Sequence, residues 1–244
     1  MLTAAAVCPH PPLLIPATTG GPAGPGDAEL ARLRQACDAA VAALAASRPD
    51  VLVVVGGAER TARFPPDAAG SLRDFGVAFT IGEGPPALPL SLTVGRWLLA
   101  RTRPGPVQLQ AVAASASPDE CLALGADLAA QAPRVAMLAM GDGPARRARG
   151  VPGAQDPAAD LYDERVADSL ATADLSLLER LDPAQDAELF VAGRAAWQVL
   201  AGAARQSPHG PQSPQSPLRA ELRYVGAPFE VTYFAANLRL AQAH

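Results

Sequence analysis

The residue with the clearest chemical potential, His10, lies near the start of the chain in the sequence Cys-Pro-His-Pro-Pro (8–12). The apolar run before it predicts a strand, so His10 would follow a strand end, where α/β sheets bind ligands. The neighbouring prolines each hold φ near about −65° and have no N–H to donate. Such a stiff loop suits a metal ligand or an acid–base group, and it suits a buried structural histidine equally well.

A second polar side chain, Asp142, follows the apolar run 134–140 in the sequence Gly-Asp-Gly (141–143). It could act as an acid–base group, or it could form an Asx turn that satisfies nearby backbone N–H groups. The three arginines that come next (Arg146, Arg147 and Arg149) are read either as a solvated loop or as a lip that binds anions.

Arg194 and Trp197 lie three residues apart in a predicted helix and therefore share one face. In one interpretation the tryptophan packs in the core and the arginine faces solvent. In the other, both line a cleft that would accept a small aromatic acid or another anion.

The elements that would position these residues alternate along the chain. Strands are expected at 2–8, 51–55, 75–81, 107–112, 134–140, 218–225 and 229–236; helices are expected at 28–47, 90–102, 118–131, 158–171, 175–181 and 186–204, the last bent near Gly193.

Ser117, with Pro118 and Glu120 after it, forms a strong helix start with a capping box. The alternation predicts a three-layer α/β sandwich around a mostly parallel sheet with an antiparallel edge. We expect one domain over 1–244, with a disordered surface loop at 206–217, where Gln-Ser-Pro repeats.

Composition excludes several kinds of chemistry. All 20 basic residues are arginine, so a lysine Schiff base, a pyridoxal-phosphate lysine and a Walker-A lysine are all absent. The net charge of −4 and the lack of a basic stripe argue against nucleic acid as a partner. No apolar stretch approaches the roughly 18 residues of a membrane helix. Three widely spaced cysteines predict reduced thiols and a cytoplasmic protein.

Four stretches, in order along nearly the whole chain, resemble the class III extradiol ring-cleavage dioxygenases, whose relatives include the Memo-like proteins. The opening PHPPLLIP (9–16) is similar to the family's opening, and 49–58 is similar to its second strand, which usually ends SPH. The sequence AMGDGPA (139–145) resembles its GDLSH turn, and VGAPF (225–229) resembles its YEAPYGVGY strand. The helical stretch 156–201 fits the family as well.

The resemblance implies a site that has lost most of its functional residues. The family holds Fe(II) with two histidines and one glutamate, and a further histidine acts on protons. His10 matches the first ligand, but the second ligand falls at Ala58, the glutamate at Gly226 and the proton-transferring histidine at Ala145. One imidazole does not retain Fe(II) against water, because affinity comes from several ligands held together.

The preferred hypothesis is therefore a member of this superfamily that has lost iron and ring cleavage and binds a small aromatic or anionic ligand, or a partner, in a strand-end cleft. A second hypothesis is an active metal-dependent oxygenase or hydrolase that rebuilds its site from His10 with Glu59, Asp142 or Glu230. Glu230 would lie about 13 Å beyond Gly226 on the same strand face. A third hypothesis is a non-catalytic subunit or scaffold, including a homo-oligomer.

Overall fold

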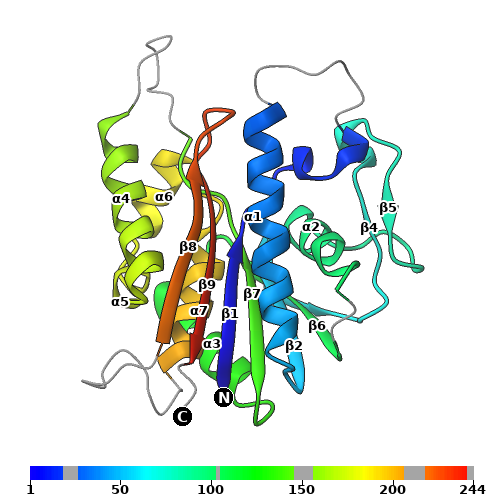
Figure 1. Ribbon diagram of the computed structural model, residues 1–244, viewed down its shortest axis with the longest axis horizontal. Coiled ribbons are helices and arrows are strands. Elements are labelled where there is room, and N and C mark those ends of the chain that lie inside the picture. The colour runs from blue at the N-terminus through cyan, green and yellow to red at the C-terminus, as the bar shows by residue number, and fades with distance from the viewer. Residues whose placement is uncertain (19–26, 103–104, 146–155, 206–217, 241–244) are drawn as a thin grey trace.

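The strand before His10, β1 (Leu2–Cys8), lies inside a seven-stranded sheet in the computed structural model, which describes residues 1–18, 27–102, 105–145, 156–205 and 218–240 (Figure 1). It pairs in parallel with β7 (Val135–Met140) and antiparallel with β9 (Tyr233–Leu240). All of its residues except Thr3 are buried. An apolar run without alternation is what a strand covered on both faces requires.

The strands follow the order β3-β6-β2-β7-β1-β9-β8 across the sheet. The parallel centre consists of β6 (Val107–Ala113), β2 (Val51–Ala58), β7 and β1. A short antiparallel strand, β3 (Ala62–Phe64), covers part of one edge, and β9 and β8 (Leu218–Gly226) form an antiparallel pair at the other. The predicted three-layer α/β sandwich with an antiparallel edge is confirmed.

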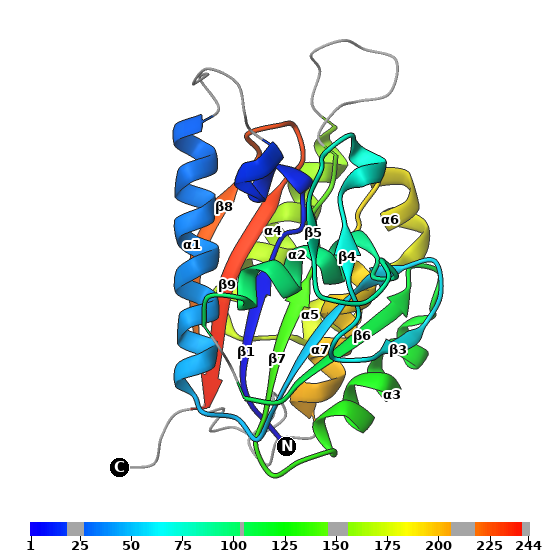
Figure 2. The same ribbon diagram turned by 90° about the vertical axis from the view of Figure 1, so that its right-hand side faces the viewer.

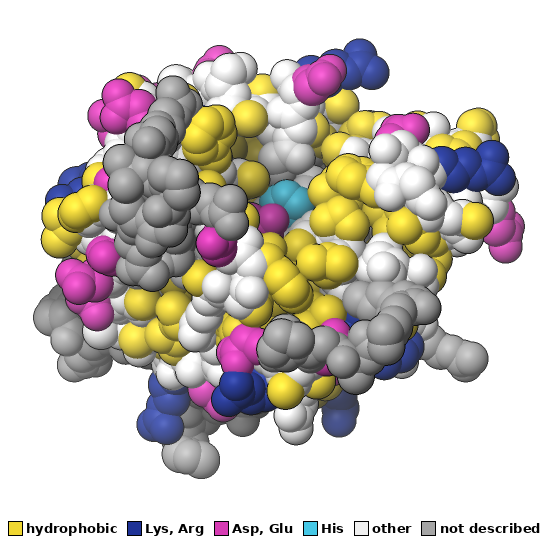
Figure 3. Space-filling model, turned by 90° about the horizontal axis from the view of Figure 1, so that it is seen from above, with side chains coloured by type: hydrophobic (Ala, Val, Ile, Leu, Met, Phe, Trp, Pro, Cys, Tyr) yellow, Lys and Arg dark blue, Asp and Glu magenta, His cyan; other side chains and the backbone are white. Residues whose placement is uncertain are grey.

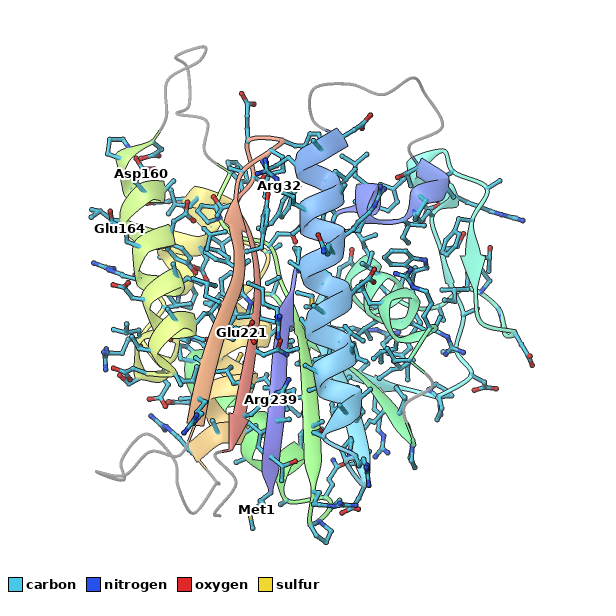
Figure 4. All side chains as sticks on the ribbon, viewed as in Figure 1. Met1, Arg32, Asp160, Glu164, Glu221 and Arg239 are labelled. Atoms are coloured by element: carbon cyan, nitrogen blue, oxygen red, sulfur yellow. The ribbon has the colours of Figure 1, made fainter. Side chains whose placement is uncertain are left out.

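Helices cover both faces of the sheet (Figures 1 and 2). On one face, α1 (Asp27–Ala46) and α2 (Leu90–Leu99) share a core with one set of strand side chains. On the other face, a second core is built from α3 (Pro118–Ala129), α4 (Pro157–Thr172), α5 (Ser176–Glu179), α6 (Pro183–Leu189) and α7 (Arg194–Arg205). The outer surface of α4 carries acidic residues, including Asp160 and Glu164 (Figure 4). No described helix is long and apolar enough to cross a membrane.

Two glycines set the spacing of the α3–α7 pair. A Cβ on Gly125 would lie 2.0 Å from the carbonyl oxygen of Val199, and one on Gly202 would lie 2.2 Å from that of Leu122. The two helix backbones therefore approach each other more closely than any larger residue would allow. The expected capping box at the start of α3 is present, with Ser117 and Glu120 bonding reciprocally.

Three predicted elements are wrong. The strand expected at 75–81 is a short 3-10 helix, Arg73–Phe75, that ends at Gly76 in the left-handed region and precedes the two-residue β5 (Thr80–Ile81), which pairs with β4 (Gly70–Ser71). The bent helix expected at 186–204 is two helices, because Phe190 has φ of 55° and stops α6. The strand expected from residue 229 begins at Tyr233, because Glu230 has φ of 61° in the preceding turn. The predicted loop 206–217 lies outside the described residues.

Candidate functional site

Strand register brings several of the predicted positions to one level at the carboxyl end of the parallel strands. Cys8, Met140 and Gly56 are aligned across β1, β7 and β2. His10, Asp142 and Ala58 each follow two residues later. The site therefore begins as a row across the middle of the sheet.

The antiparallel strands extend this row toward the other edge. Val7 pairs with Ala236, so Tyr233, three residues earlier on β9, reaches the level of His10. Tyr233 in turn pairs with Gly226 at the end of β8. Positions from residue 10 to residue 233 thus meet at one edge of the fold, although they are far apart in the sequence.

His10 and Asp142 form the polar centre of the row. The Oδ1 atom of Asp142 accepts a hydrogen bond from the backbone N–H of His10 at 2.7 Å and lies 3.6 Å from the imidazole Nδ1. That Nδ1 is buried and makes no hydrogen bond within the described part of the chain. The carboxylate therefore joins β7 to the loop after β1 and faces one ring nitrogen, which leaves Nε2 for contact with a bound molecule.

The loop that carries His10 is held to α1 by an arginine. Arg34 donates from Nε to the carbonyl oxygen of Leu14 at 2.9 Å and from Nη2 to that of Leu13 at 2.7 Å. Leu14, the last residue of the 3-10 turn Pro12–Leu14, is fully buried. The proline-rich sequence and this two-point contact together limit how far the imidazole can move.

Asp142 is held by backbone contacts on both sides. Its carbonyl oxygen accepts from the N–H of Ala192 at 3.1 Å, and the N–H of Gly143 donates to Thr232 at 2.7 Å. A Cβ at Gly141 would lie 2.4 Å from Gly193, so the turn packs directly against the segment before α7. The Asp142 carboxylate accepts the backbone N–H of His10. This corrects the expectation that it forms an Asx turn within the loop 141–143.

Burial raises the pKa of the Asp142 carboxyl above its ordinary value, while His10 opposes that shift. Burial, with the nearby Asp142 charge, also raises the pKa of the Tyr233 hydroxyl. Below the row, the Cys37 thiol contacts Cys8, and this contact together with burial raises its pKa well above the ordinary value. The Cys37 thiol is therefore protonated at neutral pH and is a poor nucleophile.

Seen from the carboxyl ends of the strands, the molecule has a depression, which we call the strand-end hollow (Figure 3). The imidazole of His10, the one histidine among the described residues, lies at its base beside an acidic side chain and is surrounded by hydrophobic side chains. Only 7% of the His10 surface is exposed. An apolar recess with few polar groups at its base is the usual form of a small-molecule site.

Comparisons with known proteins give the fold alone. No family model matches the chain, and no curated protein matches its sequence. An uncharacterized protein from Escherichia coli K12, whose crystal structure is known, aligns with a TM-score of 0.53 and 14% sequence identity, covering 96% of this chain and 99% of that one. Its similarity supports the three-layer α/β architecture.

The positions at which the resemblance implies metal ligands lie around His10 but carry no donors. Ala58 ends β2 and Gly226 ends β8, while Ala145, the implied position of the proton-transferring histidine, forms a bridge with Val231. Within the described residues, no three side chains of His, Cys, Asp or Glu are arranged to hold a metal ion. The side chains present at this row do not fit an Fe(II) centre of two histidines and a glutamate.

A tyrosine occupies the space where a side chain at Gly226 would begin. A Cβ there would lie 2.6 Å from the Tyr224 hydroxyl, which donates to Glu29 on α1 at 2.8 Å. Arg32, at the upper end of α1 in Figure 4, pairs with the same carboxylate. Tyr224 therefore blocks the implied glutamate position, and its hydroxyl is directed to α1 instead of the strand-end hollow.

Of the remaining predicted cleft residues, two are exposed and two are buried. Glu59 and Glu230 are exposed, and Glu230 lies in a turn instead of on a strand. Trp197 is fully buried and meets Phe234 edge to face at 5.9 Å. Its placement in the cleft wall is therefore wrong, as is that of Arg194, which is 3% exposed. The anion lip at Arg146, Arg147 and Arg149 lies outside the described residues.

Arg194 belongs to a buried polar network behind the site. Its Nε lies 2.6 Å from Asp186, and its Nη1 donates to Gln198 and to the carbonyl oxygen of Ala116, both at 2.8 Å. The Tyr162 hydroxyl donates to the other Asp186 oxygen at 2.7 Å. This network ties α4, α6 and α7 to the loop after β6, and Arg194 is unavailable to a ligand.

The sequence interpretation missed Tyr233 and Tyr224. The positions of both tyrosines are set by the register of β8 and β9. That register depends on the turn before Tyr233, where β9 begins. The boundary error of four residues at the start of β9 hid the alignment of Tyr233 with His10.

Proposed function

We propose that this chain is a divergent relative of the class III extradiol dioxygenases that has lost iron-dependent ring cleavage. It binds a small aromatic or anionic molecule in the strand-end hollow and acts in the cytoplasm. Three buried cysteines without disulfide bonds agree with a reducing compartment.

One observation carries this proposal: the row of positions at the level of His10. Strand register gathers Ala58, His10 and Gly226 where the resemblance implies three ligands, yet only His10 can donate electrons to a metal. Chance similarity of short motifs gives no reason for such positions to meet. Shared ancestry with later loss of the ligands accounts for both the arrangement and the missing side chains.

Iron loading tests the loss of chemistry. The purified protein is incubated with Fe(II) without oxygen, desalted and measured for bound iron, beside a His10→Ala variant. We expect far less than one iron per chain in both, since a single imidazole binds weakly. One iron per chain that is lost in His10→Ala would contradict the proposal.

Ligand binding tests the retained function. Small aromatic carboxylates such as benzoate, and the neutral benzamide, are titrated while amide NMR signals are followed. Shifts should concentrate around His10, Asp142 and Tyr233 and should disappear in His10→Ala. Arg101→Ala, two residues beyond the end of α2, serves as a matched control with unchanged binding. Shifts scattered over the surface, or identical in His10→Ala, would remove the strand-end hollow as the binding site.

The contact between Asp142 and His10 favours a second candidate, a rearranged catalytic site that uses these two residues. The side chains of Glu59 and Glu230 are exposed, so this candidate rests on His10 and Asp142 alone. Oxygen uptake with catechol after metal loading distinguishes the candidates. Uptake that requires both His10 and Asp142 would establish the rearranged site, and its absence agrees with loss of the reaction.

A further inference from the structure

A cavity of about 440 Å³ lies far from His10, between β6, the end of α2 and the segment that carries β4 and β5. Figure 1 shows β4 and β5 at the opposite side of the molecule from β8. The cavity reaches the first residues of β6, whereas His10 follows the carboxyl end of β1, and two strands separate β6 from β1. It is therefore distinct from the strand-end hollow.

The walls of this cavity are mainly apolar and firmly built. Leu99 and Leu109 are buried and form part of the lining, together with Ile81 and Val107. Gly82 has φ of 97°, and a Cβ there would lie 2.8 Å from Ala69, so the wall from the β5 side depends on a glycine. The volume falls within the usual range of small-molecule pockets, roughly 300–1,000 Å³.

One cation is fixed in this apolar lining. Arg96 donates from Nη1 to the carbonyl oxygens of Pro66 and Ala68, the second at 2.9 Å. Its Nε and Nη2 groups make no hydrogen bond within the described part of the chain. These two nitrogens form the side of a guanidinium that binds a carboxylate through two parallel hydrogen bonds. The carbonyls hold the group in place, which lowers the entropy cost of binding.

We infer that this cavity is a second small-molecule site, which takes a molecule with an apolar body and a single carboxylate that pairs with Arg96. Glu83 also lines the cavity and is exposed. Its negative charge disfavours a doubly charged group such as phosphate over a monoanion. The inference does not depend on the proposed function, because no residue of the strand-end hollow lines this cavity.

Calorimetry with octanoate and octanol as matched probes tests the site in the full chain. Octanoate should bind at one site, and octanol about 10- to 100-fold more weakly, because it lacks the charge-assisted hydrogen bonds. Octyl phosphate should bind more weakly than octanoate at a pH where it is a dianion. Equal affinity for octanoate and octanol, or no saturable binding of octanoate, would overturn the inference.

Variants locate the binding. Arg96→Gln should weaken octanoate about 10- to 100-fold, whereas Arg101→Gln, which removes a cation outside the cavity on the same helix end, should leave it unchanged. Ala100→Trp should block the cavity while keeping Arg96, which covers the case in which Arg96→Gln fails to fold. His10→Ala should bind octanoate normally. Unchanged binding in Ala100→Trp, or loss in His10→Ala, would place the ligand elsewhere and overturn the inference.

Discussion

Two buried aspartates in this molecule pair with basic side chains, and the pairs differ in which polar groups remain available to a ligand. One oxygen of Asp186 accepts a hydrogen bond from Tyr162, the other lies 2.6 Å from Arg194 Nε in an ion pair, and Arg194 makes further hydrogen bonds of its own. Asp142 faces His10 across 3.6 Å, and the ring nitrogen facing it has no hydrogen bond among the described residues. In the first pair, both carboxylate oxygens have partners within the protein, so the pair serves the architecture. The second retains bonding capacity at the base of a hollow, as expected of a binding site.

The largest expected effect comes from breaking the complete pair. Arg194→Met leaves the Asp186 charge buried without its cation and strands the carbonyl oxygens that Arg194 satisfies. We expect the free energy of unfolding to fall by about 3–5 kcal/mol in urea denaturation at pH 8. Arg101→Ala, which removes an exposed ion pair with Asp38, should have a much smaller effect. Comparable losses in the two variants would refute the contrast.

The pH dependence of stability sharpens the same comparison. Burial raises the pKa of Asp186 to about 6, against the opposing effects of Tyr162 and Arg194. The folded state therefore binds a proton more tightly than the unfolded state. The contribution of Asp186 is fully present below pH 4 and is lost as pH rises through about 6, a change of about 3 kcal/mol.

Urea unfolding at a series of pH values measures this slope. Asp186→Asn should flatten the profile between pH 4 and 6, since it removes the titrating group. A profile that keeps its slope in the asparagine variant would assign the effect to another group. Asp142, whose pKa burial also raises, changes stability in the same direction, so Asp142→Asn should remove a separate part of the slope.

Substitutions in the incomplete pair should have smaller effects on stability. Asp142→Ala removes the acceptor for the His10 N–H and should lower the free energy of unfolding by about 1–3 kcal/mol. His10→Ala keeps that backbone bond and should lower it by about 1 kcal/mol or less. Chemical denaturation of both variants gives the comparison. A larger loss from His10→Ala would mean that His10 is structural.

A similarly small effect is expected at the implied glutamate position. Gly226→Ala places a methyl group against the Tyr224 hydroxyl and should cost about 1 kcal/mol, because the tip of a long side chain can move. Tyr224→Phe should relieve part of this cost, so a double-mutant cycle should show coupling between the two positions. Strictly additive effects would show that Tyr224 does not occupy that space.

The sequence predicted those features that depend on neighbouring residues, and it failed for those that depend on contacts between residues far apart in the chain. The predicted starts of β2, α2 and β6 and the capping box at Ser117 are confirmed, because they depend on local patterns. The break between α6 and α7 depends on Phe190 in a left-handed conformation that phenylalanine rarely adopts, so no local signal indicated it. Arg194 was misplaced because three of its four partners, Asp186, Ala116 and Ala114, lie 8 to 80 residues away. Asp142 was brought beside His10 by register, which only the assembled sheet supplies.

The position of β1 has a consequence for how the chain is made. Both of its neighbours in the sheet, β7 and β9, come more than 120 residues later. At a synthesis rate of roughly 5–20 residues per second, β1 waits on the order of ten seconds for β7 and about twice as long for β9. During that time an apolar strand has neither edge paired. The ribosome-bound chain is therefore most exposed to chaperones and to aggregation through the segment that later holds His10 in place.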